Sequence, residues 1–237
     1  ASGATGRLLV AQLLNGGHDV RVIVRSPERF SELIQNQEHL SVIPASILDL
    51  SDKDLAGHVA GCDAVASCLG HTLSFRGMFG PPYRLVTQAA RRLCAAIQAK
   101  APSEPVRYVL MNTTGNRNRD LDERISFAQQ CVIGLLRVLL PPHADNEQAA
   151  DFLRTQIAGD DRFIEWAAVR PDGLIDEVSV TDYEEYPSPT RSAIFDAGKT
   201  SRINVAHFMA ELLTRDDKWQ QWKGQMPVIY NRARKDS

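Results

Sequence analysis

The stretch Ala1-Ser2-Gly3-Ala4-Thr5-Gly6 decides the fold, because it leads directly into a helical pattern of apolar residues at Leu9, Val10 and Leu13. Small residues and paired glycines at the start of a helix suit a nucleotide pyrophosphate. Glycine lets the backbone approach the phosphates, and the helix N-terminus presents unpaired N–H groups and the positive end of its dipole. We therefore predict a phosphate-binding loop formed by Ser2, Gly3, Ala4, Thr5 and Gly6.

A loop of this kind normally hangs from the end of a buried strand. The sequence places no strand ahead of Ala1, so we expect a first strand that is missing from the given chain and that belongs in the middle of the sheet. Without it, both neighbouring strands would have unpaired backbone edges.

Strand-like and helix-like segments alternate over the first 175 residues. Apolar strand patterns occupy residues 20–24, 40–44, 64–69, 106–111 and 163–169. Helical patterns occupy residues 6–15, a segment starting at Ser26-Pro27, and residues 51–60, 83–100, 125–140 and 146–158. This alternation predicts an α/β fold, a Rossmann-like doubly wound parallel sheet with helices on both faces.

We predict one single domain, residues 1–237, and expect its remaining segments to form the side that binds the substrate. Residues 71–82 form a loop with glycine and proline after a strand, and residues 172–200 form a longer loop region in a small C-terminal lobe. Loops of this length are usually lids or binding loops, although an insertion without a role is the alternative. We expect a helix capped by Asn204 and a final strand, residues 226–230, at the sheet edge.

Composition narrows the class of protein. A net charge of −2 gives no reason to expect nucleic-acid binding, and no apolar run reaches the length of a membrane span. The cysteines Cys62, Cys68, Cys94 and Cys131 form no CxxC pair, which favours buried free thiols and a cytoplasmic location. No His, Cys, Asp and Glu cluster has the spacing of a metal site, and nothing indicates the oligomeric state.

Arg25 directly follows the strand pattern 20–24, where NAD-specific sites carry an acidic residue for the ribose 2′-hydroxyl. A carboxylate there would repel a 2′-phosphate, whereas a guanidinium can bind it with two hydrogen bonds. An arginine at a strand end can also simply be solvated. With the loop in place, Arg25 favours NADP as the cofactor.

Five short motifs resemble the atypical short-chain dehydrogenase/reductases. They are Ala1-Ser-Gly-Ala-Thr-Gly-Arg7, Val24-Arg-Ser-Pro27, Ala64-Val-Ala-Ser-Cys-Leu-Gly70, Val169-Arg-Pro171 and Ser201-Arg-Ile-Asn-Val-Ala-His-Phe208. The chain is most similar to the NAD(P)-binding branch of NmrA-like proteins and biliverdin/flavin reductases. The resemblance implies that Ser46 and Ile47 contact adenine, that Cys68, Leu69 and Gly70 border the ribose, and that Asn112, Thr113 and Thr114 lie by the nicotinamide.

The catalytic pair of that family is absent. No Tyr-x-x-x-Lys occurs in the chain, and its two positions hold Pro142 and Asn146. By the same resemblance Thr113 is a candidate hydroxyl for orienting the substrate, while a histidine typical of the branch is replaced by Gly173. His71 is a substitute proton donor by residue type, although an idle loop histidine is the commoner case.

These features predict an NADP(H)-binding oxidoreductase that reduces a small organic acceptor by hydride transfer. A non-catalytic NADP-binding sensor of NmrA-like type is the alternative, because the Tyr/Lys pair is lost. Sugar-nucleotide epimerase or dehydratase chemistry normally needs the same pair and is less favoured. Four further side chains are weaker candidates for substrate contact, and they are Arg117, Arg119, Tyr183 and Tyr186.

Overall fold

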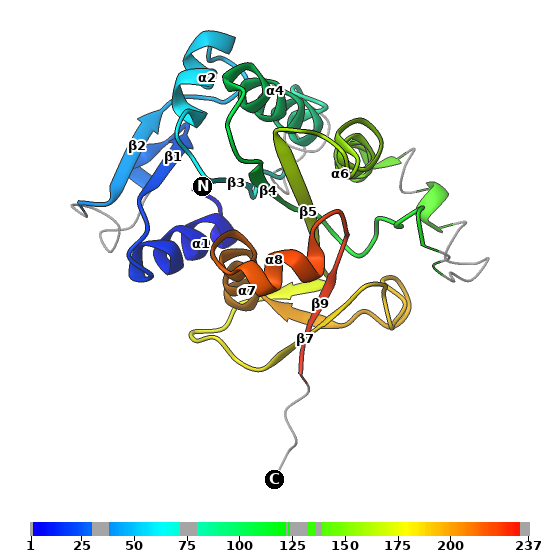
Figure 1. Cartoon of the computed structure of the whole chain (residues 1–237). Helices are drawn as coiled ribbons and strands as arrows, with labels where there is room; N and C mark the ends of the chain where they lie inside the picture. Colours follow the sequence, from blue (N-terminus) through cyan, green and yellow to red (C-terminus); the bar gives the residue numbers. More distant parts are fainter. Residues whose placement is uncertain are drawn as a thin grey trace.

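The computed structural model describes residues 2–29, 38–71, 80–121, 123, 132–135 and 139–232. Cys131, most of the expected helix 125–140 and most of the loop 71–82 lie outside these ranges. The elements, in chain order, are α1 (Ala4–Asn15), β1 (Val20–Val24), the 3-10 turn η1 (Pro27–Arg29), β2 (Leu40–Pro44), α2 (Asp52–Val59), β3 (Ala64–Ser67), α4 (Leu85–Lys100), β4 (Val106–Met111), α6 (Pro141–Phe152), the π-helical turn η2 (Leu153–Ile157), β5 (Ile164–Pro171), β6 (Gly173–Ile175), β7 (Tyr183–Tyr186), β8 (Lys199–Ser201), α7 (Arg202–Thr214), α8 (Asp216–Trp222) and β9 (Val228–Asn231) (Figure 1).

The main sheet has five strands in the order β3-β4-β5-β9-β7. Its pairs are parallel except for β7, which runs antiparallel to β9. A separate parallel pair joins β1 to β2, and a third small sheet joins β6 to β8. The carboxyl ends of the parallel strands in the main sheet therefore meet at one edge, where ligands collect in folds of this class.

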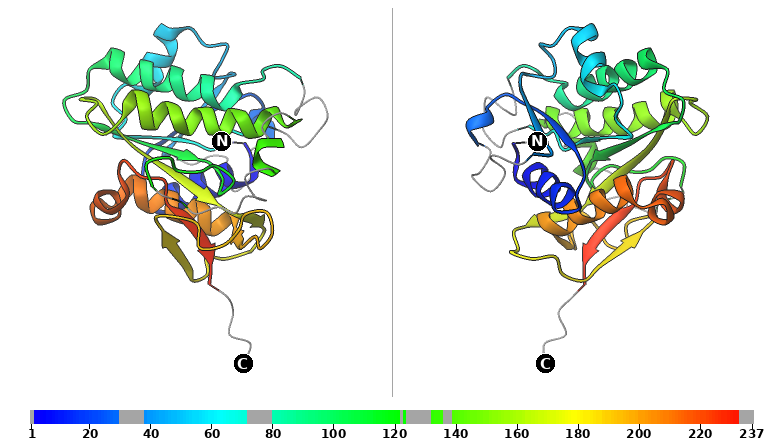
Figure 2. Two further views of the ribbon diagram at one scale, coloured as in Figure 1. Left: turned by 90° about the vertical axis from the view of Figure 1, so that its right-hand side faces the viewer. Right: turned by 60° about the vertical axis from the view of Figure 1, so that its left-hand side comes forward.

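Helices cover both faces of the main sheet (Figures 1 and 2). Along β4, Tyr108 and Leu110 pack into a core with α2, α4 and α6, while Val109 between them packs into a second core with α1, α7 and α8. This alternation follows from the two-residue period of a strand. Trp219 and Trp222 of α8 are buried in the second core. The doubly wound Rossmann-like fold is thus confirmed.

Between the two sheets the described strands leave a gap in pairing. No described strand pairs with both β1 and β3, and the N-terminus lies between these two strands (Figure 1). Helix α1 connects the two parts, because it packs beside β1 in a small apolar cluster and donates from Gln12 Nε2 to the Ile203 carbonyl of α7 at 3.2 Å. The strand expected ahead of the loop stays a prediction.

Several element boundaries differ from the sequence-based expectation. Helix α6 begins at Pro141 itself, because proline fits the first turn of a helix, where its missing N–H has no partner to lose. Helix α7 is capped by Ser201, whose Oγ accepts from the Asn204 N–H at 3.3 Å. Asn204 instead bonds through its side chain to Thr181 and Asn231, which ties the helix to the end of β9.

The C-terminal lobe is more ordered than the sequence suggests. Residues 172–200 contain β6, β7 and the first residues of β8, rather than only a long loop. Strand β9 lies between β5 and β7, so the expected edge position of residues 226–230 is wrong and β7 forms that edge. The four residues of β7 are all half-buried and carry no apolar run, which hides this strand in the sequence.

Arg170 at the end of β5 holds three segments together. Its guanidinium is fully buried and pairs with Glu123 at 2.7 Å, and it also donates to the carbonyls of Asn116, Pro187 and Met226. Taking a charge out of water costs several kcal/mol, and this cost is offset only when the charge is paired and its donors find acceptors. The partners of the Arg170 guanidinium come from three separate loops. The pair therefore fixes the loops around the carboxyl end of β5.

We expect Glu123→Gln to lower the free energy of unfolding by about 3–5 kcal/mol, because it leaves a buried guanidinium without its counter-charge. Urea unfolding followed by circular dichroism measures the change. The matched control is Asp196→Asn, which breaks the exposed Arg191–Asp196 pair and should leave the unfolding midpoint nearly unchanged. Equal effects of the two substitutions would show that Arg170 is not held by Glu123.

Candidate functional site

The predicted phosphate-binding loop forms the start of α1. Gly3 is the N-cap in an extended conformation, and among the described residues no side chain caps this helix. A side chain added at Gly3 would meet only open space, while Thr5 and Gly6 are buried. The first N–H groups of α1 therefore have no competing protein acceptor from a capping side chain, as an anion-binding helix start requires.

A pocket of about 440 Å³ lies beyond the carboxyl ends of β1 and β2. Arg25, Ser46 and Asp49 supply its polar lining, together with backbone and apolar atoms of Pro44, Ala45 and Leu50. Arg25 and Ser46, which were predicted separately, thus share one pocket. Ile47 instead packs against the core, and its carbonyl accepts from Arg92 at 2.7 Å.

The predicted ribose-side residues follow β3. The Cys68 thiol packs against Met209 with a sulfur–sulfur distance of 3.8 Å, and burial raises its pKa to about 11. Such a thiol is inert, so a contact with a ligand here would use the backbone. Leu69 is half-buried, and Gly70 is exposed and faces open space.

The end of β4 is a compact hydrogen-bonded turn. The Asn112 side chain is buried, accepts from the Thr113 N–H at 2.8 Å and donates to the Asn146 carbonyl of α6 at 3.0 Å. Thr113 Oγ1 accepts from the Gly115 N–H at 3.3 Å. The Thr113 hydroxyl proton is not used in that bond, so it is able to donate to a ligand. Thr114 is buried and its N–H donates to the Pro171 carbonyl.

The first turns of α6 lie beside the turn that follows β4. His143 lies so close to Gly115 that a Cβ added there would be 3.2 Å from the ring carbon Cε1, so the turn needs glycine or a shift of the ring. The resemblance places the Tyr/Lys pair at Pro142 and Asn146, and these two residues bond to each other, since Asn146 Nδ2 donates to the Pro142 carbonyl at 3.0 Å. Neither side chain is a proton donor of the Tyr/Lys type.

His71 is the other predicted catalytic residue, and its Nε2 lies 2.8 Å from Asp145 Oδ2. Both side chains are buried, with exposed fractions of 6% for His71 and 0% for Asp145. The structure therefore places His71 in a specific pair rather than in solvent. Because Asp145 precedes Asn146 on α6, the segments after β3 and β4 are both tied to one turn of this helix.

Three residues near the site were not predicted. Asp145 and His143 are on α6, and nothing in the sequence marks them, because their partners lie far away along the chain. Asp172 follows β5 directly, and its position after a strand was a usable signal. Burial raises the pKa of the Asp172 carboxyl, although the Gly198 N–H at 2.8 Å acts in the opposite direction.

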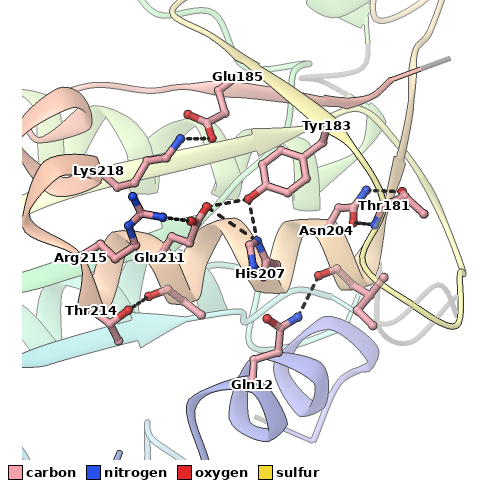
Figure 3. Close-up of polar contacts among 12 residues, drawn as sticks. Gln12, Thr181, Tyr183, Glu185, Asn204, His207, Glu211, Thr214, Arg215 and Lys218 are labelled. Atoms are coloured by element: carbon pink, nitrogen blue, oxygen red, sulfur yellow. Dashed lines mark hydrogen bonds and ion pairs between the residues drawn. The ribbon is translucent and has the colours of Figure 1, made fainter. Parts of the chain in front are cut away.

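The weaker candidates are engaged elsewhere. The Tyr183 phenol points from β7 to α7, where its oxygen lies 2.7 Å from His207 Nδ1 and 2.8 Å from Glu211 Oε2 (Figure 3). Tyr186 donates to Glu184 at 2.7 Å. Arg119 pairs with Asp151 at 3.2 Å. The bonds of Tyr183 fasten the edge strand to α7, which is a structural role.

Two further observations concern metals and membranes. In the part of the chain that the structure describes, no group of three or more His, Cys, Asp or Glu side chains is arranged to hold a metal ion. Within the same ranges, none of the helices combines the length and the apolar character that a membrane crossing demands.

Comparison with known proteins identifies one family and many solved structures with a similar fold. A family model described as NAD(P)H-binding matches residues 1–216. Among curated proteins no relative matches. A short-chain dehydrogenase/reductase from Veillonella parvula, solved in complex with NADP, superposes with a TM-score of 0.69 at 16% identity, covering 98% of this chain and 92% of that one.

Two other solved structures have the same arrangement. A Rossmann-fold NAD(P)-binding family protein from Shigella flexneri has a TM-score of 0.64 at 19% identity, covering 98% of this chain and 91% of that one. A candidate NADH-flavin reductase from Streptococcus pneumoniae has a TM-score of 0.63 at 17% identity, covering 97% and 95%. At these identities the likeness establishes the fold.

Tyr183→Phe should lower the free energy of unfolding by about 1 kcal/mol at neutral pH, because it removes the hydrogen bonds to α7. Burial, followed by the Glu211 carboxylate, raises the pKa of the folded phenol above its ordinary value. Above about pH 10 the phenol ionises in the unfolded protein before it ionises in the folded protein, which lowers the free energy of unfolding of the wild type. The Phe variant has no phenol at this position, so the difference in the free energy of unfolding between the two proteins shrinks.

Urea unfolding at about pH 7 and about pH 10.5 measures this pH dependence. Tyr83→Phe, at a tyrosine that is 56% exposed, is the matched control and should change stability at neither pH. A Tyr183→Phe difference that stays constant between the two pH values would contradict the expectation.

Proposed function

The chain belongs to the NAD(P)H-binding family, and on that premise we propose that it is an NADPH-dependent oxidoreductase that reduces a small organic acceptor. One observation carries the proposal. A pocket that Arg25 lines at the ends of β1 and β2 is combined with side chains after β3 and β4 that can carry a proton, namely His71 and Thr113. A reductase needs both, whereas simple nucleotide binding needs only the first.

The residues present fit a dinucleotide. The uncapped start of α1 suits the pyrophosphate, and Gly3 leaves open space in front of it. The adenosine half would lie in the pocket lined by Arg25 and Ser46. The side chains of Arg25 and Ser46 can both donate hydrogen bonds to a ligand in this pocket.

Arg25 supports NADPH rather than NADH. Its guanidinium can bind a 2′-phosphate through two charge-assisted hydrogen bonds, and it is exposed, so it keeps its reach into the pocket. Asp49 lines the same pocket and opposes an anion there. The balance of these two charges sets how strongly the site prefers the phosphorylated cofactor.

At the other end of the site, the bound nicotinamide would supply a hydride to the acceptor. Thr113 would orient that acceptor, because its hydroxyl can donate to an oxygen while Oγ1 is fixed by the Gly115 N–H. Asn112 keeps the turn rigid through its bonds to the Thr113 N–H and to α6. His71 would supply the proton that accompanies the hydride.

A second function has one specific observation in its favour. Pro142 and Asn146 occupy the positions of the Tyr/Lys pair and bond to each other inside α6. A protein that binds NADPH without turning it over, as a sensor, would need neither catalytic side chain. We rank it second, because the buried His71–Asp145 pair has no evident use in a sensor.

Titration of the purified protein with NADPH and NADH tests the cofactor proposal. Arg25→Ala should weaken NADPH binding roughly tenfold to hundredfold, as the loss of a charged hydrogen bond of about 1.5–3 kcal/mol implies, and should change NADH binding little. Asp49→Asn should strengthen NADPH binding. Arg21→Ala is the matched control, because Arg21 is on the same strand but donates to the His58 carbonyl outside the pocket.

NADPH oxidation in the presence of quinones, flavins or aldehydes tests the reductase proposal. Thr113→Val should lower kcat roughly tenfold or more while the Kd for NADPH is unchanged, and Thr113→Ser should retain most of the rate. Tight NADPH binding with no turnover on any acceptor would instead support the sensor. Equal loss in the Ser and Val variants would exclude the hydroxyl as the active group.

A further inference from the structure

Arg92 of α4 reaches the loop that forms one wall of the pocket beside Arg25. We propose that Arg92 is a positioning residue, which holds this loop, residues 45–50, in the shape that receives the adenosine half of the dinucleotide. The inference rests on the proposed binding of the cofactor. It assigns part of the affinity for adenosine to a side chain that is not among the described residues lining the pocket.

The loop 45–50 follows β2 and supplies most of the pocket wall. Arg25 lines the pocket from the end of β1, and the loop lines it from the other side through Ala45, Ser46, Asp49 and Leu50. The Ala45 N–H donates to the Val24 carbonyl at 3.0 Å, which ties the start of the loop to the residue before Arg25. The separation of the two walls therefore depends on how the rest of the loop is held.

Within the loop the backbone forms one short turn. The N–H groups of Asp49 and Leu50 both donate to the Ser46 carbonyl, at 3.0 Å and 3.3 Å. A single turn of this kind has little stability of its own, because several backbone dihedral angles are fixed for few hydrogen bonds. The shape of the turn therefore depends on contacts from outside the loop.

The Arg92 guanidinium supplies such contacts from α4, which lies beside α2 (Figure 1). Nη1 donates to the Ile47 carbonyl at 2.7 Å, and Nη2 donates to the Leu50 carbonyl and to Asp52 Oδ1, the latter at 2.9 Å. One planar guanidinium can bind both carbonyls because its N–H groups diverge in a fixed fork. The Arg92 side chain is 22% exposed, whereas the Asp52 side chain is 98% exposed, so the ion pair adds little to the two carbonyl bonds.

Apolar packing also acts on the loop. The side chains of Ile47 and Leu50 pack against the core between the main sheet and α2, α4 and α6. Packing of this kind has no preferred direction, so it keeps the loop close to the core without fixing how its turn is rotated. Hydrogen bonds require a narrow range of angles, so the two bonds from Arg92 fix that rotation and, with it, the direction of Ser46 and Asp49.

A preformed wall binds its ligand more tightly, because no binding free energy is consumed in ordering it. Loss of the Arg92 bonds therefore weakens the binding of that half of the cofactor which lies in this pocket, and of no other part. Adenosine 2′,5′-bisphosphate carries the adenosine half alone, and nicotinamide mononucleotide carries the other half. These two probes separate an effect on the pocket from a general effect on the protein.

Calorimetric titration of the folded protein with adenosine 2′,5′-bisphosphate tests the proposal. Arg92→Met should raise the Kd roughly tenfold, as the loss of a charged hydrogen bond implies, and should leave the Kd for nicotinamide mononucleotide unchanged. Arg92→Lys keeps the charge but should also raise the Kd, since an ammonium group lacks the fork that binds both carbonyls. A fall in the unfolding midpoint with an unchanged Kd would overturn the proposal, because Arg92 would then only stabilise the fold.

Arg91→Met is the matched control for charge. It removes the same charge from the neighbouring position of α4, but the Arg91 guanidinium carbon lies 5.0 Å from the centre of the Phe152 ring instead of contacting the loop. The Kd for adenosine 2′,5′-bisphosphate should therefore stay at the wild-type value. Equal Kd values in Arg91→Met and Arg92→Met would overturn the proposal and leave apolar packing as the contact that holds the loop.

Hydrogen exchange in the protein without cofactor tests the loop independently of any ligand. The amides of Asp49 and Leu50 should exchange roughly tenfold faster in Arg92→Met than in the wild type or in Arg91→Met, because the turn opens more often. Unchanged exchange would overturn the proposal. If Arg92→Met does not fold, Arg92→Lys takes its place in both measurements. If the wild-type protein binds neither NADPH nor adenosine 2′,5′-bisphosphate, the proposed function fails, whereas wild-type affinity in the Arg92 variants overturns this inference alone.

Discussion

The parallel direction of the strands is the constraint on which the site depends. Because β3, β4 and β5 run the same way, the segments that leave them emerge at one edge of the sheet, whatever their separation in sequence. His71, Thr113 and Asp172 each follow one of these strands. Helix α6 contacts two of these segments, through Asp145 to His71 and through the Asn146 carbonyl to Asn112.

Helix α6 carries no Tyr-x-x-x-Lys pair, yet it contacts the segments after both β3 and β4. Pro142 starts the helix and cannot carry a proton, and Asn146 uses its side chain within the helix. The intervening Asp145 is directed at α4 and His71 instead. Asp145 caps α4 and bonds to His71, so a substitution there removes contacts to two segments at once.

The sequence predicted those features of the fold that depend on residues close together in the chain. Strand β4 has the expected bounds, and the shared pocket of Arg25 and Ser46 follows from two adjacent strand ends. The pairing of β7 with β9 and the bond between His71 and Asp145 could not be predicted, because each joins residues separated by tens of positions. The prediction that Asn204 caps α7 was wrong for the same reason. The side chain of Asn204 bonds to Thr181 and Asn231, which are distant in the chain, and Ser201 caps the helix.

The β1–β2 pair shares no hydrogen-bonded strand with the main sheet among the described residues, and it joins the rest of the fold through α1, whose Gln12 donates to the Ile203 carbonyl, and through Arg92 of α4, which donates to the Ile47 carbonyl. A dinucleotide that extended from Arg25 to Thr113 would bridge these two parts. Its binding free energy would then add to the cohesion of the whole chain by mass action, by roughly 2.7 kcal/mol at a hundredfold excess over Kd. A ligand with this span would thus stabilise the folded chain, and its affinity would be readable as a rise in the unfolding midpoint.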